Sequence, residues 1–225
     1  MSFCPYYKIK YNRELLGEFS SSLLKEIRLV AAFIERRKEV GSIYFGGGTP
    51  ALAIDYLPEV VNLTKSLFDV KGDMGIELHP GDVNPTLLEK LKKIRFNMIS
   101  LGIQSFKDTC LSVLERDRID NIASLRMIKD FNFEVIDVDL IFGIPGQSEE
   151  DLVYDFRVAV ENGATQISTY PFIEFTYAGL KNKPAGREVK KKMLEALVCV
   201  SEEMGFSRSS IWTFSKAGAS FSILR

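Results

Sequence analysis

The chain has 225 residues, 46% of them hydrophobic and 26% charged, and its formal net charge is −1. This composition is typical of one globular domain, and the near-neutral charge argues against a nucleic-acid or anionic-membrane surface. No apolar run reaches the roughly 18 residues of a membrane span. No signal peptide is visible and the three cysteines are far apart, which argues against a disulfide framework, so we expect a cytoplasmic protein.

The first expected element is a long helix from about Asn12 to Glu39. Apolar residues at spacings of three and four form one stripe along it: Leu16, Phe19, Leu23, Ile27, Val30 and Ile34. Positive charges are favourable in the last turn of a helix, and this turn is expected to contain Arg36, Arg37 and Lys38. A glycine often ends a helix, and Gly41 is expected to end this one.

Strands and helices alternate after this helix. The expected strands are short apolar segments: Ser42–Phe45, Met74–His79, Met98–Leu101, Val135–Phe142 and Gln166–Tyr170. The expected helices are about Asp55–Phe68, Asn84–Lys93, Lys107–Leu114, Asn121–Phe131, Ser148–Asn162 and Arg187–Met204. Lys71-Gly72-Asp73 is expected to be a turn, Ser148 and Asp151 have the spacing of a capping box, and residues 205–225 have little pattern.

This alternation predicts parallel strands joined by crossover helices, in either a doubly wound open sheet or a barrel. We expect an α/β fold, a partial (β/α)6 TIM-type barrel that lacks its first strand. Residues 1–205 would form this core, and residues 206–225 would begin a further region. In such a barrel the active site lies at the carboxyl ends of the strands.

The stretch Ser42-Ile43-Tyr44-Phe45-Gly46-Gly47-Gly48-Thr49-Pro50 carries the strongest local signal. A strand that ends in three glycines can bring bare backbone close to a ligand, although a tight turn is the simpler alternative. Several later strands also end in polar or glycine residues. One site at this edge of the sheet would therefore collect Gly46–Thr49, Glu77, Gln104, Asp139 and Tyr170.

Each of these polar residues also has a structural interpretation. Glu77 and Asp139 could form salt bridges or cap helices, because a buried carboxylate needs a partner. Arg116 lies in a charged run, which is usually a solvated face. His79 is expected to be a hydrogen-bonded structural residue, not a metal ligand. Two cysteines inside expected helices are predicted to be core residues: Cys110 and Cys199.

Three ordered motifs carry a resemblance to a known family. They are Phe45-Gly46-Gly47-Gly48-Thr49-Pro50, Ile99-Ser100-Leu101-Gly102-Ile103-Gln104-Ser105-Phe106 and Asp137-Val138-Asp139-Leu140-Ile141-Phe142-Gly143-Ile144-Pro145-Gly146-Gln147, preceded by Phe3-Cys4-Pro5-Tyr6-Tyr7. Over about residues 1–175 the sequence closely resembles the radical S-adenosylmethionine enzymes. Within them it is most similar to the oxygen-independent coproporphyrinogen III oxidase-like family.

The resemblance implies a site for S-adenosylmethionine. By it, Gly47, Gly48 and Thr49 would hold the methionine end and Glu77 would meet its polar groups. Its carboxylate and ribose would be bound by Gln104, Arg116 and Asp139. The chemistry agrees, because arginine suits a carboxylate and an acid suits ribose hydroxyls.

The resemblance also implies a metal centre. Cys4 would be the last cysteine of a Cys-x-x-x-Cys-x-x-Cys motif that holds three irons of a [4Fe–4S] cluster. The middle cysteine of the motif falls at Met1, and the first would precede the chain. We therefore expect a fragment that lacks the first strand and a C-terminal region, and that is inactive as given.

In this family one electron from the cluster cleaves S-adenosylmethionine to a 5′-deoxyadenosyl radical, and the oxidases use the radical to convert tetrapyrrole propionates to vinyl groups. The implied partners are a tetrapyrrole substrate and an electron donor such as flavodoxin or ferredoxin. Three alternatives remain: a haem chaperone, a haem-degrading radical methyltransferase, and a degenerate domain without a cluster.

Overall fold

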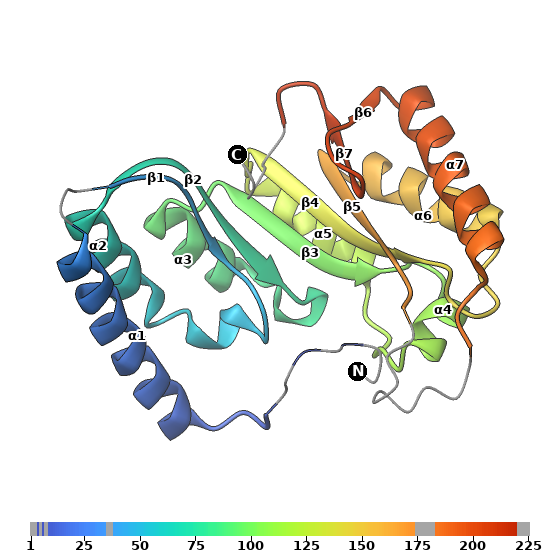
Figure 1. Cartoon of the computed structure of the whole chain (residues 1–225). Helices are drawn as coiled ribbons and strands as arrows, with labels where there is room; N and C mark the ends of the chain where they lie inside the picture. Colours follow the sequence, from blue (N-terminus) through green and yellow to red (C-terminus); the bar gives the residue numbers. More distant parts are fainter. Residues whose placement is uncertain (1–3, 5, 7–8, 35–37, 174–182, 220–225) are drawn as a thin grey trace.

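The computed structural model describes residues 4, 6, 9–34, 38–173 and 183–219. In these residues one sheet has the strand order β1-β2-β3-β4-β5-β7-β6 (Figure 1). Neighbouring strands from β1 to β5 are parallel, and β7 is antiparallel to both β5 and β6. The strands are β1 (Glu39–Phe45), β2 (Asp69–Leu78), β3 (Met98–Gln104), β4 (Val135–Phe142), β5 (Gln166–Pro171), β6 (Phe206–Arg208) and β7 (Thr213–Lys216).

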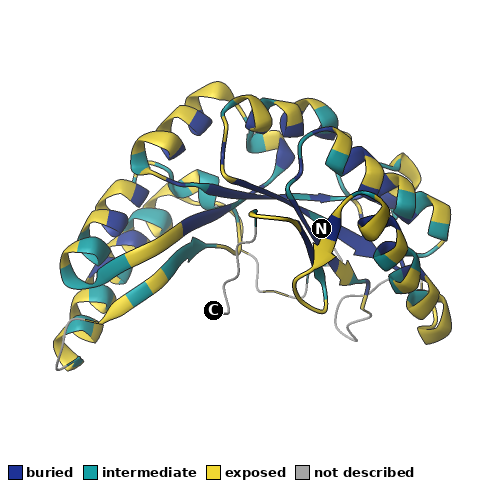
Figure 2. Cartoon of the chain, turned by 90° about the horizontal axis from the view of Figure 1, so that it is seen from above, coloured by how far each residue is buried: buried dark blue, intermediate teal, exposed yellow. Residues whose placement is uncertain are grey.

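Helices connect the parallel strands and lie along the convex side of the curved sheet (Figure 2). The α-helices are α1 (Arg13–Phe33), α2 (Leu57–Leu67), α3 (Pro85–Ile94), α4 (Asp108–Val113), α5 (Asn121–Asp130), α6 (Glu149–Glu161) and α7 (Arg187–Glu203), and short 3-10 turns are η1 (Pro50–Ala53) and η2 (Pro80–Asp82). Among the described residues, no helix has both the length and the apolar character that a membrane crossing requires.

The two faces of the sheet differ because successive side chains of a strand point to opposite sides. Ile76, Ile99 and Val138 face the helices and belong to the main apolar core. The opposite, concave face carries polar side chains from each central strand. The expected α/β fold with an open, barrel-like sheet is confirmed, and its helices lie on one face, which excludes the doubly wound alternative.

Several local predictions are also confirmed. β4 has the expected bounds, and α6 begins with the expected capping box, in which the side chains of Ser148 and Asp151 bond to each other's backbone N–H groups. The side chain of Asn84 caps α3 by accepting from the N–H of Leu87. These elements follow from local sequence because caps and apolar runs act over a few residues.

The prediction that the first helix ends at Gly41 is wrong. Helix α1 ends at Phe33, and Gly41 lies inside β1 instead of ending the helix. Lys38 therefore follows the helix, while Arg36 and Arg37 lie outside the described residues. The apolar stripe of this helix is only partly covered: Phe19 is 64% exposed and Val30 is 46% exposed.

The predicted turn at Lys71-Gly72-Asp73 is also wrong, because these residues lie inside β2. A side chain at Gly72 would overlap the carbonyl oxygen of Gly41 on the neighbouring strand. The register of β1 and β2 shifts between Val40 and Ser42, next to this contact. Gly72 therefore permits a close approach of two strands and does not form a turn.

The weakly patterned tail contains a hairpin that the sequence analysis missed. Strands β6 and β7 pair with each other, and β7 pairs with β5, so this segment extends the same sheet. The division into residues 1–205 and 206–225 stays a prediction.

Candidate cofactor site

The glycine turn and Glu77 form the first part of the site. The N–H of Gly47 donates to Oε2 of Glu77 over 2.8 Å. A Cβ atom at Gly46 would lie 2.7 Å from Oε1 of Glu77, and Gly47 and Gly48 have positive φ angles of 75° and 57°. Only glycine adopts these conformations readily while leaving room for the carboxylate. The end of β2 is thus fixed to the turn that follows β1.

The end of β3 carries the second part. The pairing of β3 with β4 shifts register between Leu101 and Gln104, and Gln104 has a φ angle of 73°, which is unusual for a residue with a side chain. The guanidinium of Arg116 donates to the carbonyl oxygen of Gly102. A Cβ atom at Gly102 would lie 3.0 Å from Nε2 of Gln104 and 3.6 Å from Nη2 of Arg116. Both predicted carboxylate-binding side chains therefore flank one glycine.

Arg116 is the electrostatic centre of the site. Burial lowers the pKa of its guanidinium, and electrostatic interactions with Asp117, Asp139 and Cys4 oppose this shift. Asp139 and Cys4 are therefore close enough to Arg116 to interact with its charge. The alternative interpretation of Arg116 as part of a solvated face does not hold, since this side chain is half-buried and bonded to the end of β3.

Asp139 belongs to a polar network on the concave face. The hydroxyl of Ser100 donates to Oδ2 of Asp139 over 3.0 Å, and the hydroxyl of Ser168 donates to Oδ2 of Asp137 over 2.9 Å. Burial raises the pKa of Asp137 to about 6, and burial with the neighbouring charge of Asp137 raises the pKa of Asp139. Oδ1 of Asp137 is buried and has no hydrogen-bond partner in the described part of the chain.

Two tyrosines complete this face. Burial, followed by the negative charges of nearby acids, raises the pKa of Tyr44 on β1 and of Tyr170 on β5. The acids around Tyr44 are Glu77, Asp139 and Asp137, so β1, β2 and β4 direct ionisable groups toward one space. A polar, hydroxyl-rich face of this kind can hold a ligand that carries both cationic and hydroxyl groups.

The predicted residues fall into three contacts. Gly47 meets Glu77, Gln104 and Arg116 flank Gly102, and Arg116 interacts electrostatically with Asp139 and Cys4. Thr49 lies at the start of η1, and its side chain forms no capping hydrogen bond there. His79 accepts the N–H of Gly81 over 3.1 Å, as expected for a structural histidine.

Sequence reasoning did not assign Tyr44, Ser100, Asp137 or Ser168 to the site. The available signal was the alternation within strands: Ser100 faces the same side as Gly102, and Asp137 the same side as Asp139. The parallel register then places Ser100 opposite Asp137, and Asp139 opposite Ser168.

Metal ligands are scarce at the site. The described residues contain no group of three or more His, Cys, Asp or Glu side chains that could hold a metal ion. Cys110 is buried as predicted, but Cys199 is exposed on α7, so its assignment to the core is wrong. Met1 lies outside the described residues. Cys4 alone does not fit the three-thiolate set of a [4Fe–4S] cluster.

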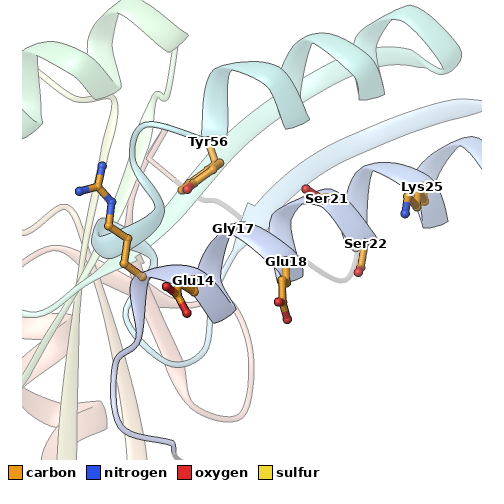
Figure 3. A pocket seen from close by; sticks show the side chains of 8 residues that line it. Glu14, Gly17, Glu18, Ser21, Ser22, Lys25 and Tyr56 are labelled. Carbon is orange, nitrogen blue, oxygen red and sulfur yellow. The ribbon is translucent and has the colours of Figure 1, made fainter.

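A separate pocket is lined by residues of α1 and by Tyr56, which precedes α2 (Figure 3). Tyr56 faces this helix, and a Cβ atom at Gly17 would lie 3.4 Å from its hydroxyl oxygen. The remaining lining residues are Arg13, Glu14, Glu18, Ser21, Ser22 and Lys25. The pocket includes no residue of the predicted site, and its charges are of both signs.

Asp155 supports the site from behind. This residue of α6 is 0% exposed, and it accepts from the hydroxyl of Ser105 over 2.6 Å and from the N–H of Phe106 over 2.7 Å. It therefore fixes the backbone that follows Gln104. Burial raises its pKa to about 7 despite these hydrogen bonds.

Asp155→Asn is expected to flatten the dependence of stability on pH. The folded protein keeps the Asp155 proton up to about pH 7, whereas the unfolded chain loses it near pH 4. The folded state therefore binds more protons in this window, and this group's contribution to the free energy of unfolding falls as the pH rises. Urea unfolding at pH 5.5 and pH 8 measures the difference.

Asp151→Asn is the matched control on the same helix. The N–H of Ser148 lowers the pKa of Asp151, so this acid is ionised at both pH values. The control should lose the same stability at each pH. An unchanged pH slope in Asp155→Asn would contradict the assignment of a raised pKa to Asp155.

A sheet of mostly parallel strands that stays open and carries its helices on one face defines an α/β partial barrel. The sequence matches the Radical SAM superfamily over residues 2–159, and the chain belongs to this superfamily.

Particular relatives handle haem or its precursors. The chain is 27% identical over 232 residues to the heme chaperone HemW of Bacillus subtilis, covering 96% of this chain and 60% of the relative. It is 27% identical over 202 residues to the oxygen-independent coproporphyrinogen III oxidase of Synechocystis, covering 87% of this chain and 41% of the relative. The chain thus spans only part of the length of either relative.

A solved structure agrees with the fold. Coproporphyrinogen III oxidase (HemN) from Escherichia coli superposes with a TM-score of 0.83 at 22% identity, over 96% of this chain and 52% of that one. At this identity the similarity concerns the fold, and it confirms the expected partial-barrel architecture.

Proposed function

We propose that this chain is the S-adenosylmethionine-binding part of a radical enzyme that acts on a tetrapyrrole, most similar to oxygen-independent coproporphyrinogen III oxidase. The observation that carries the proposal is the clustering of Glu77, Arg116 and Asp139 at one edge of the sheet. Their chemistry matches three parts of the cofactor: the methionine amino group, its carboxylate and the ribose hydroxyls.

Each residue has a proposed role. Gly47, Gly48 and Thr49 lie beside the methionine end, whose ammonium suits the Glu77 carboxylate that the Gly47 N–H orients. Arg116 and Gln104, which both lie beside Gly102, bind the carboxylate of the methionine end. Asp139, oriented by the hydroxyl of Ser100, accepts from the ribose.

The proposal for the metal centre goes beyond the described residues. A [4Fe–4S] cluster in this superfamily supplies an electron to S-adenosylmethionine. Cys4 would be one ligand, near Arg116, and two further thiolates would have to come from outside this sequence. A flavodoxin or ferredoxin as electron donor, and a reducing compartment such as the cytoplasm, belong to the same proposal.

A haem chaperone of the same superfamily is the second candidate, since one relative carries that name. Both functions would use the same partial barrel, and they differ in what happens to the bound tetrapyrrole. An oxidase converts its substrate, whereas a chaperone binds haem and leaves it unchanged.

Two measurements test the proposal in sequence. Equilibrium dialysis of this chain with S-adenosylmethionine should show one saturable site, which Glu77→Ala should weaken. A second protein carries Met1→Cys and an N-terminal extension that completes a Cys-x-x-x-Cys-x-x-Cys motif ending at Cys4. It is incubated without oxygen with coproporphyrinogen III and, separately, with haem. Vinyl products support the oxidase, and haem binding without turnover supports the chaperone. Absence of S-adenosylmethionine binding in both proteins would refute the proposed site.

A further inference from the structure

A second cavity, of about 480 Å³, lies on the helix-covered side of the sheet, at the first turns of α7. Phe142 contributes to it from the end of β4, and Phe142 also belongs to the main apolar core with Val138 and Leu140. The polar network around Asp139 occupies the opposite face. The cavity is thus separate from the proposed S-adenosylmethionine site.

The floor of the cavity is apolar and aromatic. It consists of Phe142, Pro171, Leu194 and Trp212. The rings of Phe142 and Trp212 lie 6.0 Å apart between centroids and are tilted by 42°. Phe142 is 2% exposed, while Trp212 keeps part of its surface accessible. A flat ring could therefore pack against the accessible side of Trp212.

The rim of the cavity is cationic. Arg187, Lys190 and Lys191 line it from the N-terminal turns of α7, where positive charge is unfavourable next to the helix dipole. The helix dipole therefore does not explain why these cations stand at this end of α7. An anion placed between them would be attracted by the cations and by the helix dipole together.

The described contacts of these three cations do not neutralise all of the positive charge at the rim. Lys191 lies 3.9 Å from Glu195, and both side chains are exposed. Lys190 donates to the carbonyl oxygen of Phe172, and its stem packs against Gly143, where a Cβ atom would lie 2.7 Å from Cε. No hydrogen bond or ion pair joins Arg187 to another described residue. A guanidinium can make a planar, two-point contact with a carboxylate.

We propose that this cavity binds a small planar aromatic carboxylate. The ring system packs on Trp212 and Leu194, and the carboxylate lies between Arg187 and Lys190. The apolar floor and the cationic rim together favour a ligand with both properties. A neutral ring forms no charge-assisted hydrogen bond with the cations, and a small inorganic anion gains nothing from the floor. This site goes beyond the proposed function and requires neither S-adenosylmethionine nor a cluster.

The chain contains a single tryptophan, so its emission reports on ligands that bind near Trp212, and the variants below assign the binding to this cavity. The probes are 1-pyrenebutyrate and the matched neutral alcohol 1-pyrenebutanol, titrated against the chain while the emission of Trp212 is measured. The acid should quench the emission of Trp212, and the quenching should saturate at one molecule of acid per chain. The alcohol should bind about tenfold more weakly, as expected for the loss of a charge-assisted hydrogen bond.

Two variants locate the carboxylate. Arg187→Gln should weaken binding of the acid at least severalfold and leave the alcohol unaffected. Lys192→Gln, which removes an exposed cation of the same helix outside the cavity, should change neither. Three results would each overturn the proposal. The two probes could bind with equal affinity, Arg187→Gln could bind the acid as tightly as the unaltered chain, or S-adenosylmethionine could displace the acid.

Discussion

Arg116→Ala is expected to weaken S-adenosylmethionine binding by about 10- to 100-fold, the loss that follows removal of a charge-assisted hydrogen bond of about 1.5–3 kcal/mol. Arg116 lies where the end of β3, Asp139 and Cys4 meet, so its removal takes away the cation that would meet the methionine carboxylate. Isothermal titration calorimetry with S-adenosylmethionine measures the change.

Two controls separate recognition from general effects. Arg118→Ala removes an exposed arginine two residues away and should leave the affinity within about twofold, since exposed charges contribute little. Arg116→Lys keeps the charge but loses the planar fork, so its affinity should be intermediate. If Arg116→Ala binds as tightly as the unaltered chain while remaining folded, Arg116 does not contact the cofactor.

Gly72→Ala is expected to lower the free energy of unfolding by about 3 kcal/mol, because the added methyl group overlaps the backbone of β1. The atom that it would meet is the carbonyl oxygen of Gly41, which cannot rotate away as a side chain could. The strands must separate or shift to accept it. Urea unfolding followed by circular dichroism measures the loss.

Gly41→Ala is the matched control on the facing strand. A Cβ atom at Gly41 would meet nothing within 4 Å, and its φ angle is not positive. Its stability should therefore change by less than about 0.5 kcal/mol. Equal stability of the two variants would mean that β1 and β2 do not approach each other closely at Gly72.

These glycines illustrate what local sequence can predict. Gly46–Gly48 follow an apolar strand and precede Thr-Pro, so their turn is evident from the sequence. Gly72 lies between Lys71 and Asp73 and resembles a turn equally well, yet it lies within β2. The difference is a contact with Gly41 on another strand, which no local pattern contains.

The residues of the candidate site also divide into those that local sequence can predict and those that depend on contacts between strands. Glu77 and Asp139 could be predicted because each is an acid in the second half of an apolar strand, and the family resemblance suggested Gln104 and Arg116. Ser168 required the register between β4 and β5, which is fixed by pairing across the sheet. The hairpin of β6 and β7 was missed because its strands are 3 and 4 residues long, too short for a periodic pattern.

The order of the parallel strands has a consequence for synthesis. From β1 to β5 each strand lies beside the next one in the chain, so every new strand finds its partner already made. A chain that emerges from the ribosome can therefore build the sheet one strand and one helix at a time. The last hairpin inverts this order, because β7 must be complete before β6 can join the sheet through it. Pausing of translation between residues 208 and 213 would then leave β5 as the growing edge, and the hairpin would form last.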